Sequence, residues 1–248
     1  GKILAMVSKP DYNPNTIAEN WEQVNSEGST ALFNRATQGS YAPGSTFKIL
    51  TTLEYYRENT DSYQNYNFDC DGEFTEDGKT IHCAGNEAHG TEDLVTSFAN
   101  SCNASYANIA LSLDIGSYTK LCNSMLFNKA LPVAFESSVS SFSLKEQDSR
   151  SLIMETGIGQ GNTLVSPLHM CMIVSAIANN GTLMTPYLVD HTENYKGVTV
   201  DTYSPKEYGT LLSGDEASVM QSFLREAAAS ATAGKLEGGG YTAYGKTG

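Results

Sequence analysis

The sequence has no uninterrupted apolar run of about 18 residues, the length that a membrane-spanning helix needs. It is also poor in basic residues, because 15 Lys and Arg stand against 28 Asp and Glu and give a net charge of −13. Nucleic-acid binding requires a basic face, so this balance argues against a nucleic-acid partner. The 40% apolar and 17% charged content is that of a folded globular protein, either one large domain or two interleaved ones.

The ends of the chain are the next feature. Residues 1–8 form a strand-like pattern that is already under way, no signal peptide is recognisable, and the chain stops at Gly248. We therefore expect an excised piece of a longer polypeptide, with any membrane anchor outside it.

The cysteines are few and odd in number. They form no CxxC pair and no Cys/His metal spacing, so the sequence predicts no metal and no cofactor. Cys70 and Cys83 flank a polar, hairpin-like segment, and we expect them to lie close enough for a disulfide. Cys102, Cys122 and Cys171 lie in apolar helical contexts and are predicted to be unpaired and buried.

The four histidines are scattered and lack the spacing of a metal site or of a Ser-His-Asp set. We expect His89, next to a glycine, to be structural. His169 lies within a predicted buried helix and is expected to be a hydrogen-bonded core residue.

Three short motifs follow one another along the chain. They are Ser45-Thr-Phe-Lys48, Ser101-Cys-Asn103 and Lys246-Thr-Gly248. Each is weak alone, but the ordered set supplies the parts of a serine acyl-transfer site that uses lysine in place of histidine.

The first motif has a chemical reason for its spacing. Serine is a poor nucleophile at neutral pH, and on a helix Lys48 shares a face with Ser45 and can act as its base. A lysine is a base only when neutral, a state that apolar neighbours and a second cation, Lys246, would favour. Backbone N–H groups at the helix start can stabilise an oxyanion. The plainer alternative is that Ser45 caps a helix and Lys48 lies on the surface.

Two other patterns compete with this interpretation. Ser117-Tyr-Thr-Lys120 repeats Ser-x-x-Lys, but Ser117 follows Gly116 at an ordinary helix start, which favours capping. Residues 240–247 match the nucleotide-binding pattern G-x-x-x-x-G-K-T. That loop must follow a strand and open a helix, whereas here a Gly-rich turn precedes it and no helix follows.

The remaining sequence predicts a mixture of helices, strands and loops. Helices are expected to open at Ser45, Thr91, Ser166 and Ser213, with others on either side of Gly116; the Ser166 helix should be buried all round. Residues 182–189 are expected to form a strand or a hairpin interrupted by Pro186, and residues 241–248 to be strand-like. Residues 133–151 are expected to form a loop, and the glycines between 234 and 240 a flexible turn.

The order of the three motifs resembles that of the penicillin-binding proteins and serine β-lactamases. Further segments are similar to monofunctional, class B type transpeptidases. These are Asn34-Arg35-Ala36, Tyr41-Ala-Pro-Gly-Ser45, His89-Gly90, Gly159-Gln160-Gly161 and Ser166-Pro167-Leu168. The resemblance covers nearly the whole chain.

The resemblance implies an α+β fold of the β-lactamase/transpeptidase type. Such domains have an antiparallel, five-stranded sheet flanked by helices beside a helical subdomain, with the site between them. Residues 1–40 and 182–248 would form the sheet subdomain and residues 41–181 the mainly helical one. The family's sheet would be truncated at both ends here, so the isolated piece is expected not to complete the sheet and to be inactive.

The resemblance also implies roles. Ser45 would attack a peptidoglycan stem peptide ending in D-Ala-D-Ala, and Lys48 would take its proton. Ser101 would relay a proton, Asn103 would hold Lys48 and the substrate, and Lys246 would assist as a cation. Thr247 and Gly248 would contact the substrate.

The implied enzyme is a D,D-transpeptidase and a target of β-lactam antibiotics. It would act at the extracytoplasmic face of the bacterial membrane, beside other cell-wall synthesis proteins. Alternatives of the same fold are a β-lactam sensor domain and a D,D-carboxypeptidase or β-lactamase. The transpeptidase-like segments weigh against these alternatives, and no acidic deacylation residue is identifiable.

Overall fold

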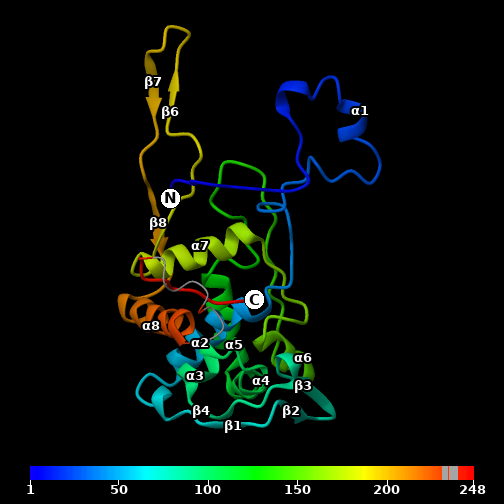
Figure 1. Cartoon of the computed structure of the whole chain (residues 1–248). Helices are drawn as coiled ribbons and strands as arrows, with labels where there is room; N and C mark the ends of the chain where they lie inside the picture. The colour runs from blue at the N-terminus through cyan, green and yellow to red at the C-terminus, as the bar shows by residue number, and fades with distance from the viewer. Residues whose placement is uncertain (231–233, 235–239) are drawn as a thin grey trace.

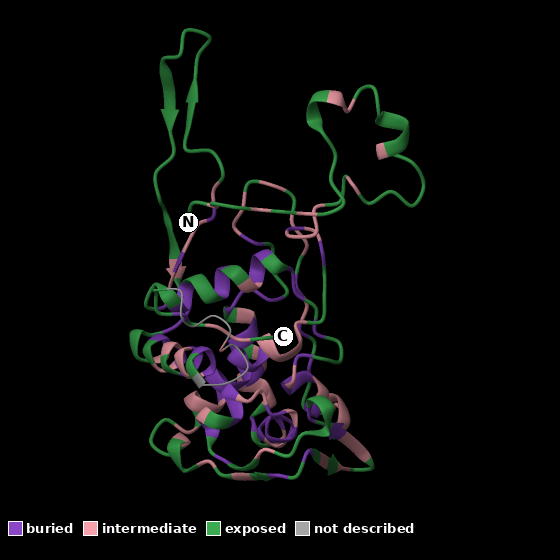
Figure 2. Cartoon of the chain, in the orientation of Figure 1, coloured by how far each residue is buried: buried purple, intermediate pink, exposed green. Residues whose placement is uncertain are grey.

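The computed structural model describes residues 1–230, 234 and 240–248. Figure 1 shows a body of packed helices from which two segments project: the region around α1 (Trp21–Val24) and the hairpin of β6 (His191–Glu193) and β7 (Thr199–Thr202). Figure 2 shows that both projections are mostly exposed, whereas the buried residues gather among the helices. The core that positions any site therefore lies in the helical body.

Helix α2 (Lys48–Glu58) lies in the middle of this body. It continues a 3₁₀ turn, Gly44–Phe47, and its side chains Leu50 and Leu53 are fully buried, as the apolar spacing predicted. It packs against three helices, α4 (Asn103–Ser112), α5 (Ile115–Ser124) and α8 (Gly214–Ser230). Among the described residues, no helix has both the length and the apolar character needed to cross a membrane.

Helix starts follow their capping residues. Asp93, rather than the expected Thr91, caps α3 (Leu94–Ala99) and forms a capping box with Thr96, because residues 90–92 pair as a strand. Ser166 caps α7 (Pro167–Ala178), with Pro167 at the first helical position as predicted. The predicted capping box of α8 is confirmed: the backbone N–H of Ser213 donates to Glu216 Oε2 at 2.7 Å, and that of Glu216 donates to Ser213 Oγ at 3.2 Å.

The strands of the described residues pair in twos, all antiparallel. The pairs are β1 (Phe68–Cys70) with β4 (Gly90–Glu92), β2 (Glu73–Glu76) with β3 (Lys79–His82), β5 (Thr182–Met184) with β8 (Glu207–Thr210), and β6 with β7. The mixture of helices and antiparallel strands is the predicted α+β class.

Two expected strands do not form. In residues 1–8, Lys2 makes one isolated bridge with Tyr187, and residues 241–248 form no strand. A strand needs a backbone partner along its length, and the described residues provide one only locally. The turn predicted between residues 234 and 240 lies largely outside the described residues.

Helix α7 is less buried than its sequence predicted. Met172, Ile173 and Ile177 are buried against α8 and β5, but Cys171 and Val174 are exposed. The face that carries Cys171 borders a cavity of about 790 Å³ that is lined on its other side by residues 1–7. Apolar composition alone does not reveal that one face of this helix is left uncovered.

The remaining described helix, α6 (Arg150–Gly157), packs against α4. It begins at Arg150, so the loop predicted over residues 133–151 ends two residues earlier than expected. His169, on α7, is buried as expected: its Nδ1 lies 2.8 Å from Ser140 Oγ and its Nε2 lies 2.6 Å from the Met125 carbonyl. Both ring nitrogens therefore have partners, and burial lowers the pKa of this imidazole.

Candidate active site

Ser45 lies in the first turn of a continuous helical segment. The preceding Gly44 has a positive φ of 55°, which breaks the chain direction and lets the turn begin. The Gly44 N–H donates to the carbonyl of Gly159 at 2.9 Å, and a Cβ on Gly159 would lie 2.0 Å from the Gly44 carbonyl oxygen. Gly159, in the Gly159-Gln160-Gly161 segment, therefore allows the backbone approach that holds the Ser45 turn in place.

Aromatic packing of Phe47 holds the same turn against the core. The ring of Phe47 is fully buried and lies 5.8 Å from that of Phe127, 5.9 Å from that of Phe142 and 6.2 Å from that of Tyr118, measured between centroids. These contacts are in the range of favourable aromatic pairs. Phe47, which directly precedes Lys48, thus anchors the turn that carries Ser45 and Lys48 to the core.

Lys48 is fully buried at the start of α2. Its Nζ donates to the carbonyl oxygen of Ser101 and to Asn103 Oδ1, each at 2.7 Å, and lies 3.4 Å from Ser101 Oγ. Burial, followed by the charge of Lys246, lowers the pKa of Lys48 to about 7. At neutral pH a substantial fraction of this amine is therefore unprotonated and able to accept a proton.

The second motif lies in the break between α3 and α4. Ser101 has a φ of +58°, an uncommon conformation for a residue with a side chain, and it aims its carbonyl at Lys48. Asn103 begins α4, and its Nδ2 donates to the carbonyl of His82 at 3.0 Å while its Oδ1 accepts from Lys48. Its two side-chain contacts fix the orientation of the amide.

The third motif approaches from the C-terminal segment. Gly245 directly precedes this motif. Its N–H donates to the carbonyl of Leu224 on α8 at 3.1 Å, which holds the start of the segment to the helical body. Burial lowers the pKa of Lys246 to about 8, and its Nζ lies 5.7 Å from the centre of the Phe98 ring. Thr247 and Gly248 are exposed.

A cavity of about 280 Å³ unites the three motifs. Its lining residues are Ser45, Ala84, Glu87, His89, Asn100, Ser101, Asn103, Thr247 and Gly248. Five of the seven residues predicted for the site are in this lining. The other two, Lys48 and Lys246, are not in the lining. Lys48 contacts the lining residues Ser101 and Asn103, and Lys246 directly precedes the lining residue Thr247. Sequence reasoning missed Glu87 and Asn100, which no motif marks.

The rival serine lies elsewhere. Ser117 does not cap its helix: Asp114 does, accepting the backbone N–H of Ser117 at 2.7 Å, because the helix begins before Gly116 rather than after it. Ser117 and Lys120 line a separate pocket with Glu54, and that pocket contains no residue of the other two motifs. Likewise, no helix follows Gly245 in the described residues, so the nucleotide-binding pattern has no structural counterpart.

Comparison with known proteins decides the family. The model of the penicillin binding protein transpeptidase domain matches residues 1–248. The chain belongs to the penicillin-binding protein transpeptidase family. The resemblance inferred from the motifs is thereby confirmed.

Individual relatives of this transpeptidase domain agree. It is 28% identical over 218 residues to the peptidoglycan D,D-transpeptidase PbpA of Mycolicibacterium smegmatis, covering 84% of this chain and 44% of that protein. It is 26% identical over 252 residues to stage V sporulation protein D of Bacillus subtilis, covering 100% of this chain and 38% of that protein. The chain thus spans less than half the length of these curated relatives.

Solved structures support the fold. The D,D-transpeptidase domain of a peptidoglycan glycosyltransferase from Eggerthella lenta superposes with a TM-score of 0.90 at 27% identity, covering 99% of this chain and 63% of that one. An imipenem acyl-enzyme complex of penicillin-binding protein A from M. tuberculosis superposes with a TM-score of 0.84 at 23% identity, covering 97% and 57%. The transpeptidase fold predicted from the resemblance is confirmed.

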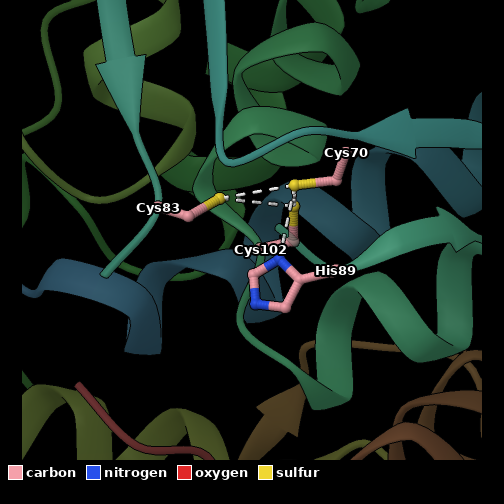
Figure 3. Close-up of side chains that lie close together, drawn as sticks. All are labelled: Cys70, Cys83, His89 and Cys102. Atoms are coloured by element: carbon pink, nitrogen blue, oxygen red, sulfur yellow. Dashed lines mark hydrogen bonds between the residues drawn. The ribbon is translucent and has the colours of Figure 1, made fainter. Parts of the chain in front are cut away.

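The cysteines of this transpeptidase domain depart from prediction. Cys70 and Cys83 are close, as expected, with their Sγ atoms 3.6 Å apart, but they are not bridged. Cys102, predicted to be only a buried apolar residue, lies 3.4 Å from Cys70 and 3.7 Å from Cys83 between Sγ atoms. His89 joins them, and these four residues form a group that could hold an ion, which the sequence spacing did not predict (Figure 3). The spacing gave no signal, because hairpin pairing brings the residues together.

Proposed function

We propose that this domain catalyses peptidoglycan D,D-transpeptidation through a serine acyl-enzyme and is acylated by β-lactams. The observation that carries the proposal is the position of Lys48: it is buried, has a lowered pKa, and lies within hydrogen-bond distance of both polar residues of the second motif, one helical turn from Ser45. The activity in the name of the relative PbpA, peptidoglycan D,D-transpeptidase, supports the same reaction.

In the proposed acylation step, Ser45 Oγ attacks the carbonyl carbon between the two terminal D-alanines, and its proton passes to neutral Lys48 Nζ. The carbon–nitrogen bond then breaks, and the leaving amine of D-alanine receives a proton from Lys48 by way of Ser101 Oγ. An ester remains on Ser45. The backbone N–H of Ser45, near the helix start, stabilises the oxyanion.

In the second step, an amine from a neighbouring stem peptide attacks the ester carbonyl. Its proton passes to Lys48 and onward to Ser45 Oγ, which leaves, and a peptide cross-link forms. In the preceding acylation step, before the terminal D-alanine leaves, Lys246 and Thr247 meet its carboxylate as a cation and a hydroxyl donor. Thr247 and Gly248 form the edge of the cavity where that carboxylate would lie.

The substrate sets the location of the domain. Peptidoglycan lies outside the cytoplasm, so the domain would act at the extracytoplasmic face of the membrane. We infer an anchor outside this chain and other cell-wall synthesis proteins as partners. The acyl-enzyme complex of a structural relative with imipenem supports β-lactams as ligands.

Labelling with a fluorescent penicillin tests the proposal on the protein that carries this domain. We expect Ser45→Ala to abolish the covalent adduct and the matched variant Ser117→Ala to retain it, because Ser117 lies in the separate pocket. Peptide mapping should place the adduct on Ser45. An adduct on Ser117, or full labelling of Ser45→Ala, would contradict the assignment. Product analysis with and without an acceptor amine distinguishes cross-linking from hydrolysis.

A further inference from the structure

A second cluster of reactive side chains lies beside the cavity. The Sγ atoms of Cys70, Cys83 and Cys102 and a ring nitrogen of His89 all lie within 4.8 Å of one another. The three thiols are almost fully buried and His89 is half-buried. Figure 3 shows the sulfur atoms and the imidazole converging on one point from different segments of the chain.

Four of the six separations between the ligand atoms match a tetrahedral zinc site, and all six are within 4.8 Å. Zn–S bonds of about 2.3 Å at the tetrahedral angle place two sulfur atoms about 3.8 Å apart, and a Zn–N bond of about 2.0–2.1 Å gives a sulfur–nitrogen separation of about 3.5 Å. The observed separations are 3.4, 3.6 and 3.7 Å between sulfur atoms and 3.4 Å from Cys70 Sγ to His89 Nδ1. A disulfide would require about 2.05 Å between two of the sulfur atoms.

The fold builds this cluster from local rules. Pairing of β1 with β4 sets Cys70 opposite Gly90, directly after His89. The hairpin of β2 and β3 returns the chain so that the Cys83 N–H donates to the carbonyl of Gly72 at 2.8 Å, which brings Cys83 beside Cys70. The fourth ligand, Cys102, is the N-cap of α4, so the helix start delivers it from the other side.

One backbone contact at Cys102 favours the thiolate, the form that binds metal. The Ser105 N–H donates to Cys102 Sγ at 3.3 Å at the N-terminus of α4, where the helix dipole stabilises negative charge. Polar contacts to ligand atoms of this kind are typical of metal sites.

The number of thiols also favours a metal over a bridge. A disulfide between any two would leave the third within about 4 Å and able to attack it by thiol–disulfide exchange. A metal ion uses all three thiols and the imidazole at once. Three thiolates and one imidazole are a ligand set of structural zinc sites.

We propose that Cys70, Cys83, His89 and Cys102 bind one Zn²⁺ ion, which fixes the Ser101–Asn103 motif beside the cavity. On binding, each thiol gives up its proton to solvent, so three thiolates offset the two positive charges. Cys102 lies between Ser101 and Asn103, the two residues that contact Lys48, and His89 itself lines the cavity. The metal would thus hold Ser101 in its positive-φ conformation.

Metal analysis of the protein that carries this domain, purified without chelators, tests the site independently of catalysis. We expect one equivalent of zinc per protein, its loss in Cys70→Ser, and its retention in the matched variant Cys171→Ser, whose exposed cysteine lies outside the cluster. Replacing zinc with Co²⁺ in the unaltered protein should give the near-ultraviolet charge-transfer absorption of thiolate-bound cobalt. This arm decides the question even if Cys70→Ser does not fold.

A protein that takes up no zinc when it is supplied, or that carries a Cys70–Cys83 disulfide by peptide mapping, would overturn the proposal. The effect on the motif rests on the proposed function and has its own test. Zinc removal should lower the melting temperature and slow penicillin acylation, and restoring zinc should reverse both effects. If both are unchanged after complete removal, the metal does not position the motif; this result would leave the acylation of Ser45 itself unaffected.

Discussion

Lys48 is the residue on which the site depends. An amine that is fully buried is ordinarily costly, but its hydrogen bonds to Ser101 and Asn103 satisfy it. Burial and Lys246 lower its pKa, whereas Cys102, Cys83 and Glu92 act in the opposite direction. The balance leaves the pKa at about 7, where a lysine can serve as a general base near neutral pH.

The pH dependence of acylation follows from this value. Because only neutral Lys48 accepts the Ser45 proton, we expect the rate of penicillin acylation to rise with pH through about 7 and then to level off. At pH 6 the rate should be roughly tenfold below its plateau, since about a tenth of the amine is then neutral. Stopped-flow measurement of acylation between pH 5 and 9 checks this expectation.

The variant Lys48→Ala is the control for the pH dependence. It should lose roughly 10²–10⁴-fold in acylation rate, the usual contribution of a general base, and its residual rate should lack the inflection near pH 7. A rate within a few-fold of the parent would show that another group takes the proton.

At the scale of elements, helix α2 carries a second buried ionisable group. Glu54 is 2% exposed, and burial, followed by the charge of Glu58, raises its pKa to about 7. The folded state therefore keeps the proton of this carboxyl up to about pH 7, whereas the unfolded chain releases it near 4.5. The contribution of Glu54 to stability is consequently lost as pH rises between these two values.

Replacing this carboxyl should stabilise the domain in alkaline solution. We expect Glu54→Gln to raise the free energy of unfolding by about 1–3 kcal/mol at pH 8 and to have little effect at pH 4.5. Urea unfolding at the two pH values measures the difference. The matched variant Glu19→Gln, which removes an equal charge from an exposed site, should change little at either pH. An equal effect of Glu54→Gln at both pH values would refute the explanation.

The positions of the motif residues at the ends of helices also explain the polar character of the site. Ser45 lies in a helical first turn, Ser101 in the break between α3 and α4, and Asn103 at the first position of α4. Such positions combine free backbone N–H groups with side chains that point away from the helix body. Three helix ends in one place therefore supply a polar site within an otherwise apolar core.

For the whole molecule, the cavity is formed between the helical body and the C-terminal segment. Ser45, Ser101 and Asn103 form one side, and Thr247 and Gly248, from the segment held to α8 through Gly245, form the other. The proposed division into a sheet subdomain, residues 1–40 and 182–248, and a helical subdomain, residues 41–181, would place the site between the two.

A covalent ligand that contacts both sides should stabilise the fold. We expect penicillin to raise the melting temperature of the protein that carries this domain by about 2–4 °C for each kcal/mol that the adduct contributes. ATP should cause no shift, because the pattern at residues 240–247 opens no helix that could bind phosphate. Differential scanning fluorimetry compares the two. Stabilisation by ATP, or none by penicillin in a labelled sample, would contradict this view of the cavity.

Much of the site could be predicted from the sequence because its motifs are local. One helical turn separates Ser45 from Lys48, and glycine and proline mark the breaks where Ser45 and the α7 helix begin. The predicted caps at Ser166 and Ser213 are confirmed for the same reason, since capping depends on residues three apart. The cap of α3 was misplaced because the pairing of β4 with β1 is not local.

By itself, then, the sequence determined the helices with strong apolar spacing, the order of the motifs and the family. Only the tertiary structure decided which faces of α7 are covered, that Lys48 lies within reach of both Ser101 and Asn103, and that the expected cysteine pair is part of a four-residue cluster. The physical reason is one of range. Helix spacing and capping depend on residues a few positions apart, whereas burial and the meeting of side chains depend on segments that only folding brings together.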